Sequence, residues 1–173
     1  MNNSELIIEP LSKKTLNDAI KLIIDLFGSK PSDFDSPEKW MPASIAKKKD
    51  EKLYASTNCT YVKYYVAIVN GKVIGTTGIY TQKDDEKDSA WIAWYCVNPI
   101  YRGKGYGSKL LDFTIDLAKK MKKRFLKLYT SYNTEIKKAI SLYEKRGFKL
   151  IKTDNHPDTK EEMIYMALDL KKG

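Results

Sequence analysis

Cysteine and histidine are scarce in this sequence of 173 residues, which contains two cysteines and one histidine. Cys59 and Cys96 are not spaced as a CxxC pair and have no histidine nearby, so we expect neither a disulfide framework nor a bound metal. A single histidine excludes every site that needs two, and His156 lies among residues typical of a turn. We therefore predict reduced, packed thiols and a histidine in a surface loop.

Long apolar runs and glycine- or proline-rich tracts are also missing. No run approaches the ~20 apolar residues that a membrane helix needs, and 9 glycines and 6 prolines are too few for a collagen-like or disordered chain. The first residues lack the basic and apolar segments of a secretory signal. We expect a cytoplasmic protein with no membrane association, in which residues 1–173 form a single domain.

Arginine is rare within a basic composition. The chain has 31 lysines and arginines against 22 acidic residues, a net charge of +9, yet only Arg102, Arg124 and Arg146 are arginine. The positive charge favours anionic partners such as a phosphorylated cofactor, a nucleic acid or a membrane surface. Because direct base readout depends on the arginine fork, we expect no specific nucleic acid partner and interpret the lysine clusters as solvated helix faces.

Apolar periodicity and turn residues predict the element order β-α-α-β-β-β-α-β-α-β-β. Asn70-Gly71 is a strong hairpin signal between two of the strands. The order predicts one mixed sheet with helices on both faces. The expected strands cover 6–11, 60–69, 72–81, 89–97, 125–130, 148–153 and 163–170, and the expected helices cover 16–27, 45–53, 105–121 and 134–145.

The most informative segment is residues 97–108, where an apolar strand ends and a glycine-rich loop leads into an amphipathic helix. Glycines let backbone N–H groups converge on a ligand, and a helix N-terminus adds partial positive charge, so this segment suits phosphate or pyrophosphate. Two familiar phosphate loops do not fit. The Walker pattern and the dinucleotide pattern both need a glycine where this chain has Ser108 or Leu110.

A third pattern does fit, because Arg102-x-x-Gly105-x-Gly107 resembles the acetyl-CoA loop (Q/R)-x-x-G-x-(G/A) of the GNAT superfamily of N-acetyltransferases. A second block, residues 139–148, is similar to the A-x-x-L-Y-x-x-x-G-F segment of the same superfamily. The two blocks are separated by a helix and a strand, as in the family. The resemblance covers nearly the whole chain and implies an α/β GNAT-like fold: a single mixed, mostly antiparallel sheet of about seven strands with helices on both faces.

The resemblance also implies roles for individual residues, with acetyl-CoA as cosubstrate. The main chain at Val97 would pair with the pantetheine arm, Asn133 is a further candidate contact for that arm, and Tyr143 would protonate the departing thiolate. Tyr143 also completes an apolar helix stripe, so a core role is its alternative. The pyrophosphate is expected on the backbone of Arg102, Gly103, Lys104, Gly105, Tyr106, Gly107 and Ser108.

The general base is not in the place that the family pattern suggests. Many members carry a carboxylate on the fourth strand, whereas residues 89–97 contain no acid. The amine proton then leaves through ordered water or to one of the loop acids Asp33, Asp35, Glu86 and Asp88. The aromatic residues Trp91, Trp94 and Tyr95 either line an acceptor pocket or fill the core.

These observations predict an acetyl-CoA-dependent N-acetyltransferase that acts on a primary amine. Direct attack in a ternary complex is favoured, because no Cys–His pair is present to carry an acyl intermediate. The acceptor, a small molecule or a protein amine, is unidentified, and residues 28–58 and 154–162 are expected to form its walls. The alternative is a non-catalytic acyl-CoA-binding or regulatory domain of the same fold. A homodimer is compatible with either.

Overall fold

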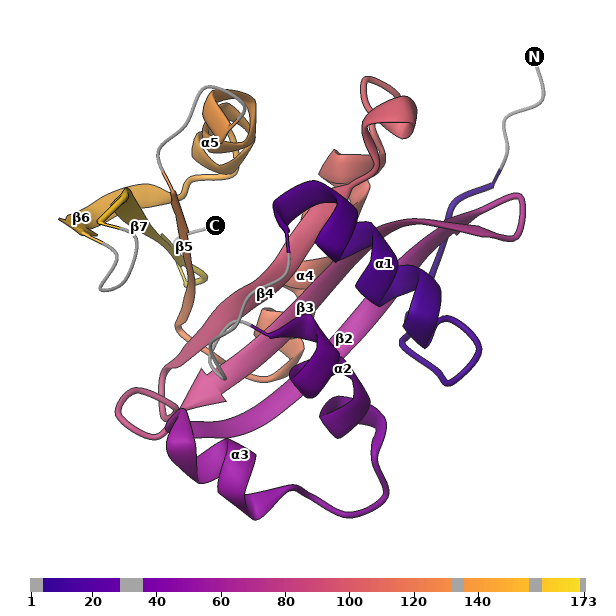
Figure 1. The fold of residues 1–173 in the computed structure, drawn as a ribbon. Helices are drawn as coiled ribbons and strands as arrows, with labels where there is room; N and C mark the ends of the chain where they lie inside the picture. The colour runs from indigo at the N-terminus through magenta and orange to yellow at the C-terminus, as the bar shows by residue number, and fades with distance from the viewer. Residues whose placement is uncertain (1–4, 29–35, 132–135, 156–159, 172–173) are drawn as a thin grey trace.

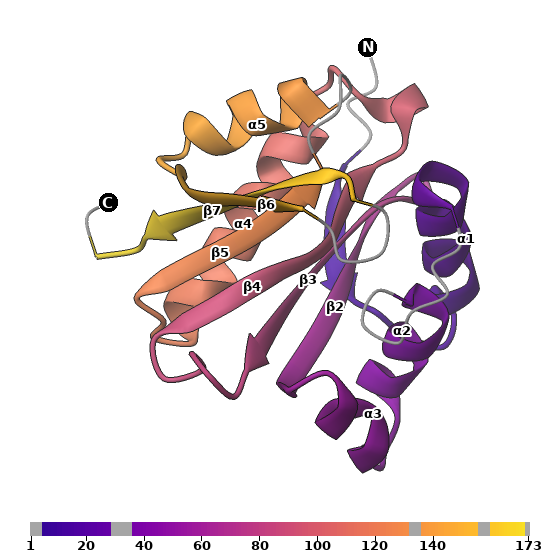
Figure 2. The same ribbon diagram turned by 60° about the vertical axis from the view of Figure 1, so that its left-hand side comes forward.

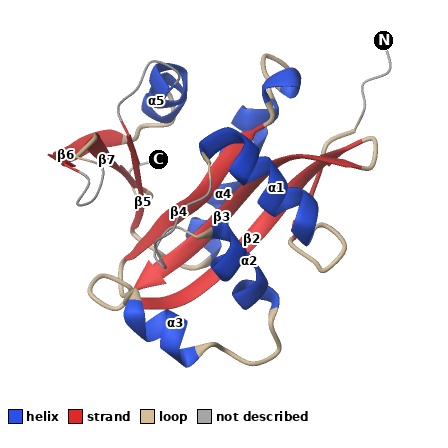
Figure 3. Ribbon diagram, in the orientation of Figure 1, coloured by secondary structure: helices blue, strands red, loops and turns tan. Residues whose placement is uncertain are grey.

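The computed structural model describes residues 5–28, 36–131, 136–155 and 160–171 of the chain. Seven strands form one sheet in the order β1-β2-β3-β4-β5-β7-β6, coloured red in Figure 3. Only β4 and β5 pair in parallel, and the other neighbours are antiparallel. The elements are β1 (Ile7–Pro10), α1 (Leu16–Phe27), α2 (Pro37–Ile45), α3 (Glu51–Ser56), β2 (Cys59–Val69), β3 (Lys72–Gln82), β4 (Ser89–Val97), the 3-10 turn η1 (Pro99–Tyr101), α4 (Tyr106–Lys120), β5 (Phe125–Ser131), α5 (Ile136–Glu144), β6 (Lys149–Asn155) and β7 (Glu162–Asp169).

Helices cover both faces of this sheet (Figure 2). We call the side under α1, α2 and α3 the α1 face, where Ile23 packs with Val66 in one core cluster. The opposite side, the α4 face, is covered by α4 and α5, and Leu111 packs there with Leu126 in a second cluster. The single mixed, mostly antiparallel sheet with helices on both faces is thus confirmed.

Local sequence signals explain one hairpin turn and one helix end. Asn70 and Gly71 have φ angles of 50° and 72°, the left-handed pair that a tight hairpin turn requires. Gly28 has φ 75° and its N–H donates to the Ile24 carbonyl across 2.8 Å, which ends α1 where the apolar stripe ends. The predicted hairpin and the predicted first helix are therefore both present.

The continuous helix predicted over residues 45–53 was wrong, because α2 ends at Ile45 and α3 begins only at Glu51. Pro37 starts α2 at a position that tolerates proline, and Ala46 adopts an extended conformation with ψ 143° that ends it. Asp50 then caps α3 by accepting a hydrogen bond from the Leu53 N–H at 3.1 Å. The C-cap at Ala46 and the N-cap at Asp50 therefore set the helix ends in this region, although the apolar spacing predicted one continuous helix.

The sheet divides between β4 and β5. Their ladder contains three pairs, the last of which is Trp91 with Lys127. Beyond that pair, β4 continues to Val97 and β5 to Ser131, and the strands diverge toward their carboxyl ends (Figure 1). We call this part of the sheet, between residues 92–97 and 128–131, the split. Unpaired strand edges in the split leave backbone groups available to a ligand.

None of the described helices is both long and apolar enough to cross a bilayer.

Candidate active site

The glycine loop follows the carboxyl end of β4, at the wide end of the split. Gly103 and Gly105 have φ angles of 77° and 80°, the left-handed region that favours glycine. A Cβ atom added at either position would meet no atom within 4 Å, so the loop backbone is open on that side. Gly105 is the N-cap residue of α4, whose first N–H groups have no partner inside the helix. With the exposed Arg102 and Lys104 beside it, this backbone can hold an anion.

Gly107, in the first turn of α4, is glycine for a different reason. The Tyr95 hydroxyl of β4 donates to the Gly107 carbonyl across 2.8 Å. A Cβ atom at residue 107 would lie 3.1 Å from that hydroxyl oxygen, a tighter contact than most side chains make. The small residue therefore lets β4 and α4 approach and joins the glycine loop to the split.

A β-bulge in β4 orients the aromatic residues of that strand. Thr76 pairs with Cys96 and Gly78 pairs with Ala93, so two residues of β4 oppose one residue of β3. Trp94 has φ 43°, and its carbonyl accepts a hydrogen bond from the Thr76 hydroxyl at 2.6 Å. Such strain is found at functional sites more often than elsewhere.

The bulge interrupts the alternation of side chains. Trp94 packs with the cluster under α1–α3, whereas Tyr95, the next residue, packs with the cluster under α4 and α5. Trp91 stacks with Tyr80, which belongs to the α1–α3 cluster. Both tryptophans therefore lie on the α1 face, and Tyr95 lies on the α4 face. In a regular strand Trp91 and Trp94, three residues apart, would lie on opposite faces.

Tyr143 of α5 lies on the α4 face beside Tyr95. The two ring centroids are 5.9 Å apart, and the Phe148 ring lies 5.7 Å from Tyr143 on another side. Burial raises the pKa of the Tyr143 phenol above its usual value of 10.0, and neighbouring Tyr95 and Cys96 raise it further. The phenol is therefore protonated at neutral pH and can act as a hydrogen-bond or proton donor.

Val97 is the last residue of β4, and its backbone has protein partners close by. The Arg102 Nε donates to the Val97 carbonyl at 3.0 Å, which folds this arginine back onto the strand end. The carbonyl keeps a second lone pair. The Val97 side chain is buried with Leu110 of α4 in a third core cluster. Arg102 therefore positions the strand end as well as contributing charge to the loop.

Of the remaining predicted cofactor contacts, three lie in the described part of the chain and one does not. Tyr106 and Ser108 lie in the first turn of α4 and are partly exposed. The Lys104 ammonium lies 5.8 Å from the Tyr101 ring centroid. Asn133 lies outside the described residues. The structure thus brings residues 97 and 102–108 together with Tyr143 around the carboxyl end of β4.

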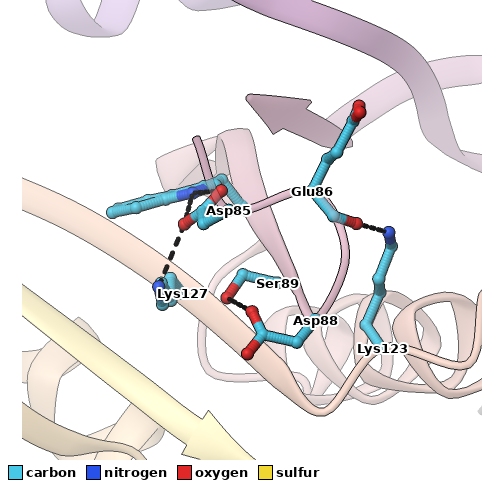
Figure 4. A network of polar contacts seen from close by, with 7 residues as sticks. Asp85, Glu86, Asp88, Ser89, Lys123 and Lys127 are labelled. Atoms are coloured by element: carbon cyan, nitrogen blue, oxygen red, sulfur yellow. Dashed lines mark hydrogen bonds and ion pairs between the residues drawn. The ribbon is translucent and has the colours of Figure 1, made fainter. Parts of the chain in front are cut away.

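Two of the four candidate bases lie at the amino end of β4, whereas the glycine loop follows its carboxyl end. Glu86 and Asp88 are in the loop before this strand (Figure 4), five or more residues from the bulge. At about 3.3 Å per residue, this is roughly 17 Å or more along the strand. The Asp88 carboxylate accepts from the Ser89 hydroxyl at 2.8 Å, and the Glu86 carbonyl accepts from Lys123. These residues fasten the paired end of the sheet and are out of direct reach of the glycine loop.

The other two candidate bases, Asp33 and Asp35, lie outside the described residues.

Asp85 is a functional candidate that the sequence did not indicate. Its carboxylate accepts a hydrogen bond from the Trp91 indole N–H at 3.0 Å and forms an ion pair with the Lys127 ammonium at 3.0 Å. Figure 4 shows this carboxylate above the strand that carries Lys127. Trp91 and Lys127 are the last pair before the split. Only the strand register brings the three residues together, so no spacing in the sequence pointed to them.

Arg146 and Asp112 were also not indicated. The Arg146 guanidinium binds the Asp112 carboxylate through both oxygens, at 2.7 and 3.1 Å. These hydrogen bonds raise the pKa of Arg146. Arg146 follows the end of α5 and Asp112 lies on α4. The pair therefore connects the helix that carries Tyr143 to the helix that begins at the glycine loop.

Comparison with known proteins agrees with this geometry. Residues 28–148 match the model of the Acetyltransferase (GNAT) family, and the chain belongs to that family. An uncharacterised N-acetyltransferase of Methanocaldococcus jannaschii is 32% identical over 89 residues, which cover 50% of this chain and 38% of the relative. The chain spans about half or less of the length of the curated relatives that it matches.

Solved structures share the fold. An N-acetyltransferase from Staphylococcus aureus superposes with a TM-score of 0.69 at 22% identity, covering 96% of this chain and 99% of that one. Naa50 of Arabidopsis thaliana, in complex with the bisubstrate analogue CoA-Ac-MVNAL, gives a TM-score of 0.70 at 20% identity and covers 95% and 98% of the two chains.

Proposed function

We propose that this protein transfers an acetyl group from acetyl-CoA to a primary amine by direct attack in a ternary complex. One observation carries the proposal: an open anion-binding loop, an unpaired strand edge and a protonated buried tyrosine meet at the carboxyl end of β4. Family membership supports the general activity.

The residues present fit acetyl-CoA. The backbone of residues 102–108 and the N-terminus of α4 suit a pyrophosphate, and the open side of Gly103 and Gly105 gives the ligand access. The unpaired edge of β4 and the main chain at Val97 suit the amide groups of the pantetheine arm. Asn133 stays a further predicted contact for that arm.

Acetyl-CoA supplies an acetyl group activated as a thioester. As the amine nitrogen forms its bond to the acetyl carbon, the C–S bond breaks and the sulfur leaves as a thiolate. Tyr143 donates its phenolic hydrogen to this sulfur, and burial keeps that hydrogen in place at neutral pH until the thiolate forms beside it. The amine proton leaves through water, because β4 has no carboxylate. Cys59 and Cys96 are both buried, and burial raises the pKa of each thiol, so neither is suited to carry an acyl group, which supports the direct route.

The competing function is a non-catalytic acyl-CoA-binding domain, and the missing β4 carboxylate favours it. Calorimetric titration with acetyl-CoA, followed by a thiol-reagent assay of CoA release with and without added amines, separates the two. Saturable binding with amine-dependent release supports the transferase. Binding without release from a broad amine panel supports the binding domain. No binding at millimolar acetyl-CoA contradicts both.

A further inference from the structure

Four aromatic rings form a continuous surface on the α1 face of the sheet, and they come from four different strands. We call Tyr80, Trp91, Tyr129 and Tyr165 the aromatic face. Trp91 lies at its centre, with ring centroids 6.3, 6.4 and 6.5 Å from those of Tyr80, Tyr129 and Tyr165, and the last two are 5.8 Å apart. All four side chains are partly exposed. Their spacing is that of edge-to-face and offset aromatic packing.

The aromatic face lies at the foot of the split. Trp91 is the last residue of β4 that pairs with β5, and its partner there is Lys127. Tyr129 lies two residues beyond Lys127 on β5. In the described part of the chain, the core cluster under α1–α3 includes no residue of β5 or β7. Tyr129 and Tyr165 therefore extend the α1 face past the region that these helices cover, on the side of the sheet opposite Tyr143.

The cations around the aromatic face are paired with acids. Lys127 lies 5.5 Å from the Trp91 ring centroid and is bound by Asp85 at 3.0 Å. Lys152 lies 4.4 Å from the Tyr165 ring centroid and is bound by Asp154 at 3.2 Å. Because each charge has its counter-ion, this surface presents rings rather than net charge. It favours a flat apolar group over a polyamine or a dicarboxylate.

A short stretch of β4 separates the aromatic face from the bulge. Ala93, on the same side, contributes a small side chain, and Trp94 packs with Phe27 of α1 at a centroid distance of 5.7 Å. From Trp91 to Trp94 the strand rises about 10 Å. That length accommodates one aromatic ring followed by a chain of two or three carbons that ends in an amine.

We propose that the aromatic face binds the acyl acceptor and that this acceptor is an arylalkylamine, a primary amine joined to an aromatic ring by a short carbon chain. The inference rests on the proposed function and deepens it. The ring packs against Trp91 and its neighbours, the chain crosses Ala93, and the nitrogen reaches the split at the bulge. There it forms the amide bond while the C–S bond breaks, Tyr143 protonates the sulfur, and the amine proton goes to water.

Acetylation of phenethylamine and of hexylamine tests the proposal, because both are primary amines of similar reach and only one has a ring. We expect a KM roughly tenfold lower for phenethylamine, the size of one good aromatic contact. Trp91→Ala should remove that difference and leave the acetyl-CoA dissociation constant unchanged. Tyr165→Leu, a milder change on the same surface, should weaken the preference several-fold. Tyr61→Ala removes an exposed ring from β2, outside the aromatic face, and serves as the control.

Equal KM values for the two amines, or a Trp91→Ala variant that keeps the preference, would overturn the arylalkylamine assignment while leaving acetyl transfer intact. If neither amine is acetylated by protein that binds acetyl-CoA, calorimetry with phenethylamine decides. Binding that Trp91→Ala and Tyr165→Leu abolish supports the surface, and no binding overturns it. Failure to bind acetyl-CoA contradicts the proposed function itself, and this inference with it.

Discussion

The Tyr95 hydroxyl and the Gly107 carbonyl are joined by a hydrogen bond of 2.8 Å. Tyr95 follows the bulge residue of β4, and Gly107 lies in the first turn of the helix that begins at the glycine loop. This contact therefore fixes the loop relative to the split. In the proposed function acetyl-CoA is held by the loop and reacts in the split, so the relative position of the two determines whether the thioester is correctly placed.

Tyr95→Phe should weaken both stability and cofactor use. Loss of one partly buried hydrogen bond lowers the free energy of unfolding by about 1 kcal/mol, measured by urea denaturation. The KM for acetyl-CoA should rise several-fold, because the loop loses its tie to β4. Tyr101→Phe, which also removes one hydroxyl near the loop, is the matched control. Equal acetyl-CoA KM values for the two variants would contradict a positioning role for Tyr95.

Gly105→Glu should abolish acetyl-CoA binding, and Gly71→Glu should not. Both glycines have left-handed φ angles, 80° and 72°, and a Cβ at either would meet no atom within 4 Å. Backbone strain is thus matched at about 1–2 kcal/mol for each, and only Gly105 adds a negative charge beside the expected pyrophosphate. Calorimetry with acetyl-CoA measures the difference. Similar affinities in the two variants would contradict the loop assignment.

Tyr143→Phe should lower kcat at least tenfold and leave the dissociation constant of acetyl-CoA unchanged. The substitution keeps the ring that packs with Tyr95 and Phe148 and removes only the proton donor. Single-turnover measurements isolate the chemical step. An unchanged single-turnover rate would assign Tyr143 to the core alone.

The Arg146–Asp112 pair should affect turnover through Tyr143, because Arg146 lies three residues after Tyr143 and its N–H donates to the Tyr143 carbonyl at 3.0 Å. Arg146→Lys keeps the charge but loses the two-point hydrogen bond. We expect a loss of less than about 1 kcal/mol in stability and a several-fold decrease in kcat, with acetyl-CoA affinity retained. Lys21→Arg, at an exposed ion pair on α1, is a control. A kcat equal to that of the control would show that the pair does not position α5.

Cys59 should make the protein less stable at alkaline pH. Burial raises the pKa of its thiol from 9.0 to about 11. Between these values the folded protein holds the proton more tightly than the unfolded chain does, so stability falls as pH rises from 9 toward 11 and is unaffected below pH 9. Urea midpoints across this range should fall less steeply in Cys59→Ala than in the original protein. Parallel pH dependences would contradict this assignment.

Much of the fold and part of the site could be predicted from short-range sequence features. The Asn70-Gly71 turn, the glycine that ends α1 and the spacing of the two family blocks depend on neighbouring residues only. The glycine loop was predicted for the same reason, since the φ angles of Gly103 and Gly105 and the start of α4 follow from local composition.

Features that depend on strand register could not be predicted. The bulge at Trp94 places Trp91 and Trp94 on the same face of the sheet. Simple alternation along a regular strand would place these two residues on opposite faces. The Asp85–Lys127 pair and the aromatic face need β3, β4, β5 and β7 side by side. Tyr95 was recognised only as a strand aromatic, because its contact with Gly107 crosses from a sheet to a helix.

The short parallel ladder between β4 and β5 also has a consequence for motion. The ladder that joins strands β1–β4 to strands β5–β7 consists of three residue pairs. Because this ladder is short, few hydrogen bonds must break for the two parts to separate there. Local opening at the ladder therefore costs less free energy than global unfolding. The amide proton of Phe125, which donates to the Asp88 carbonyl at 2.9 Å, should then exchange with solvent faster than those at the centre of β3. The split is therefore the part of the sheet where we expect local opening to cost the least free energy.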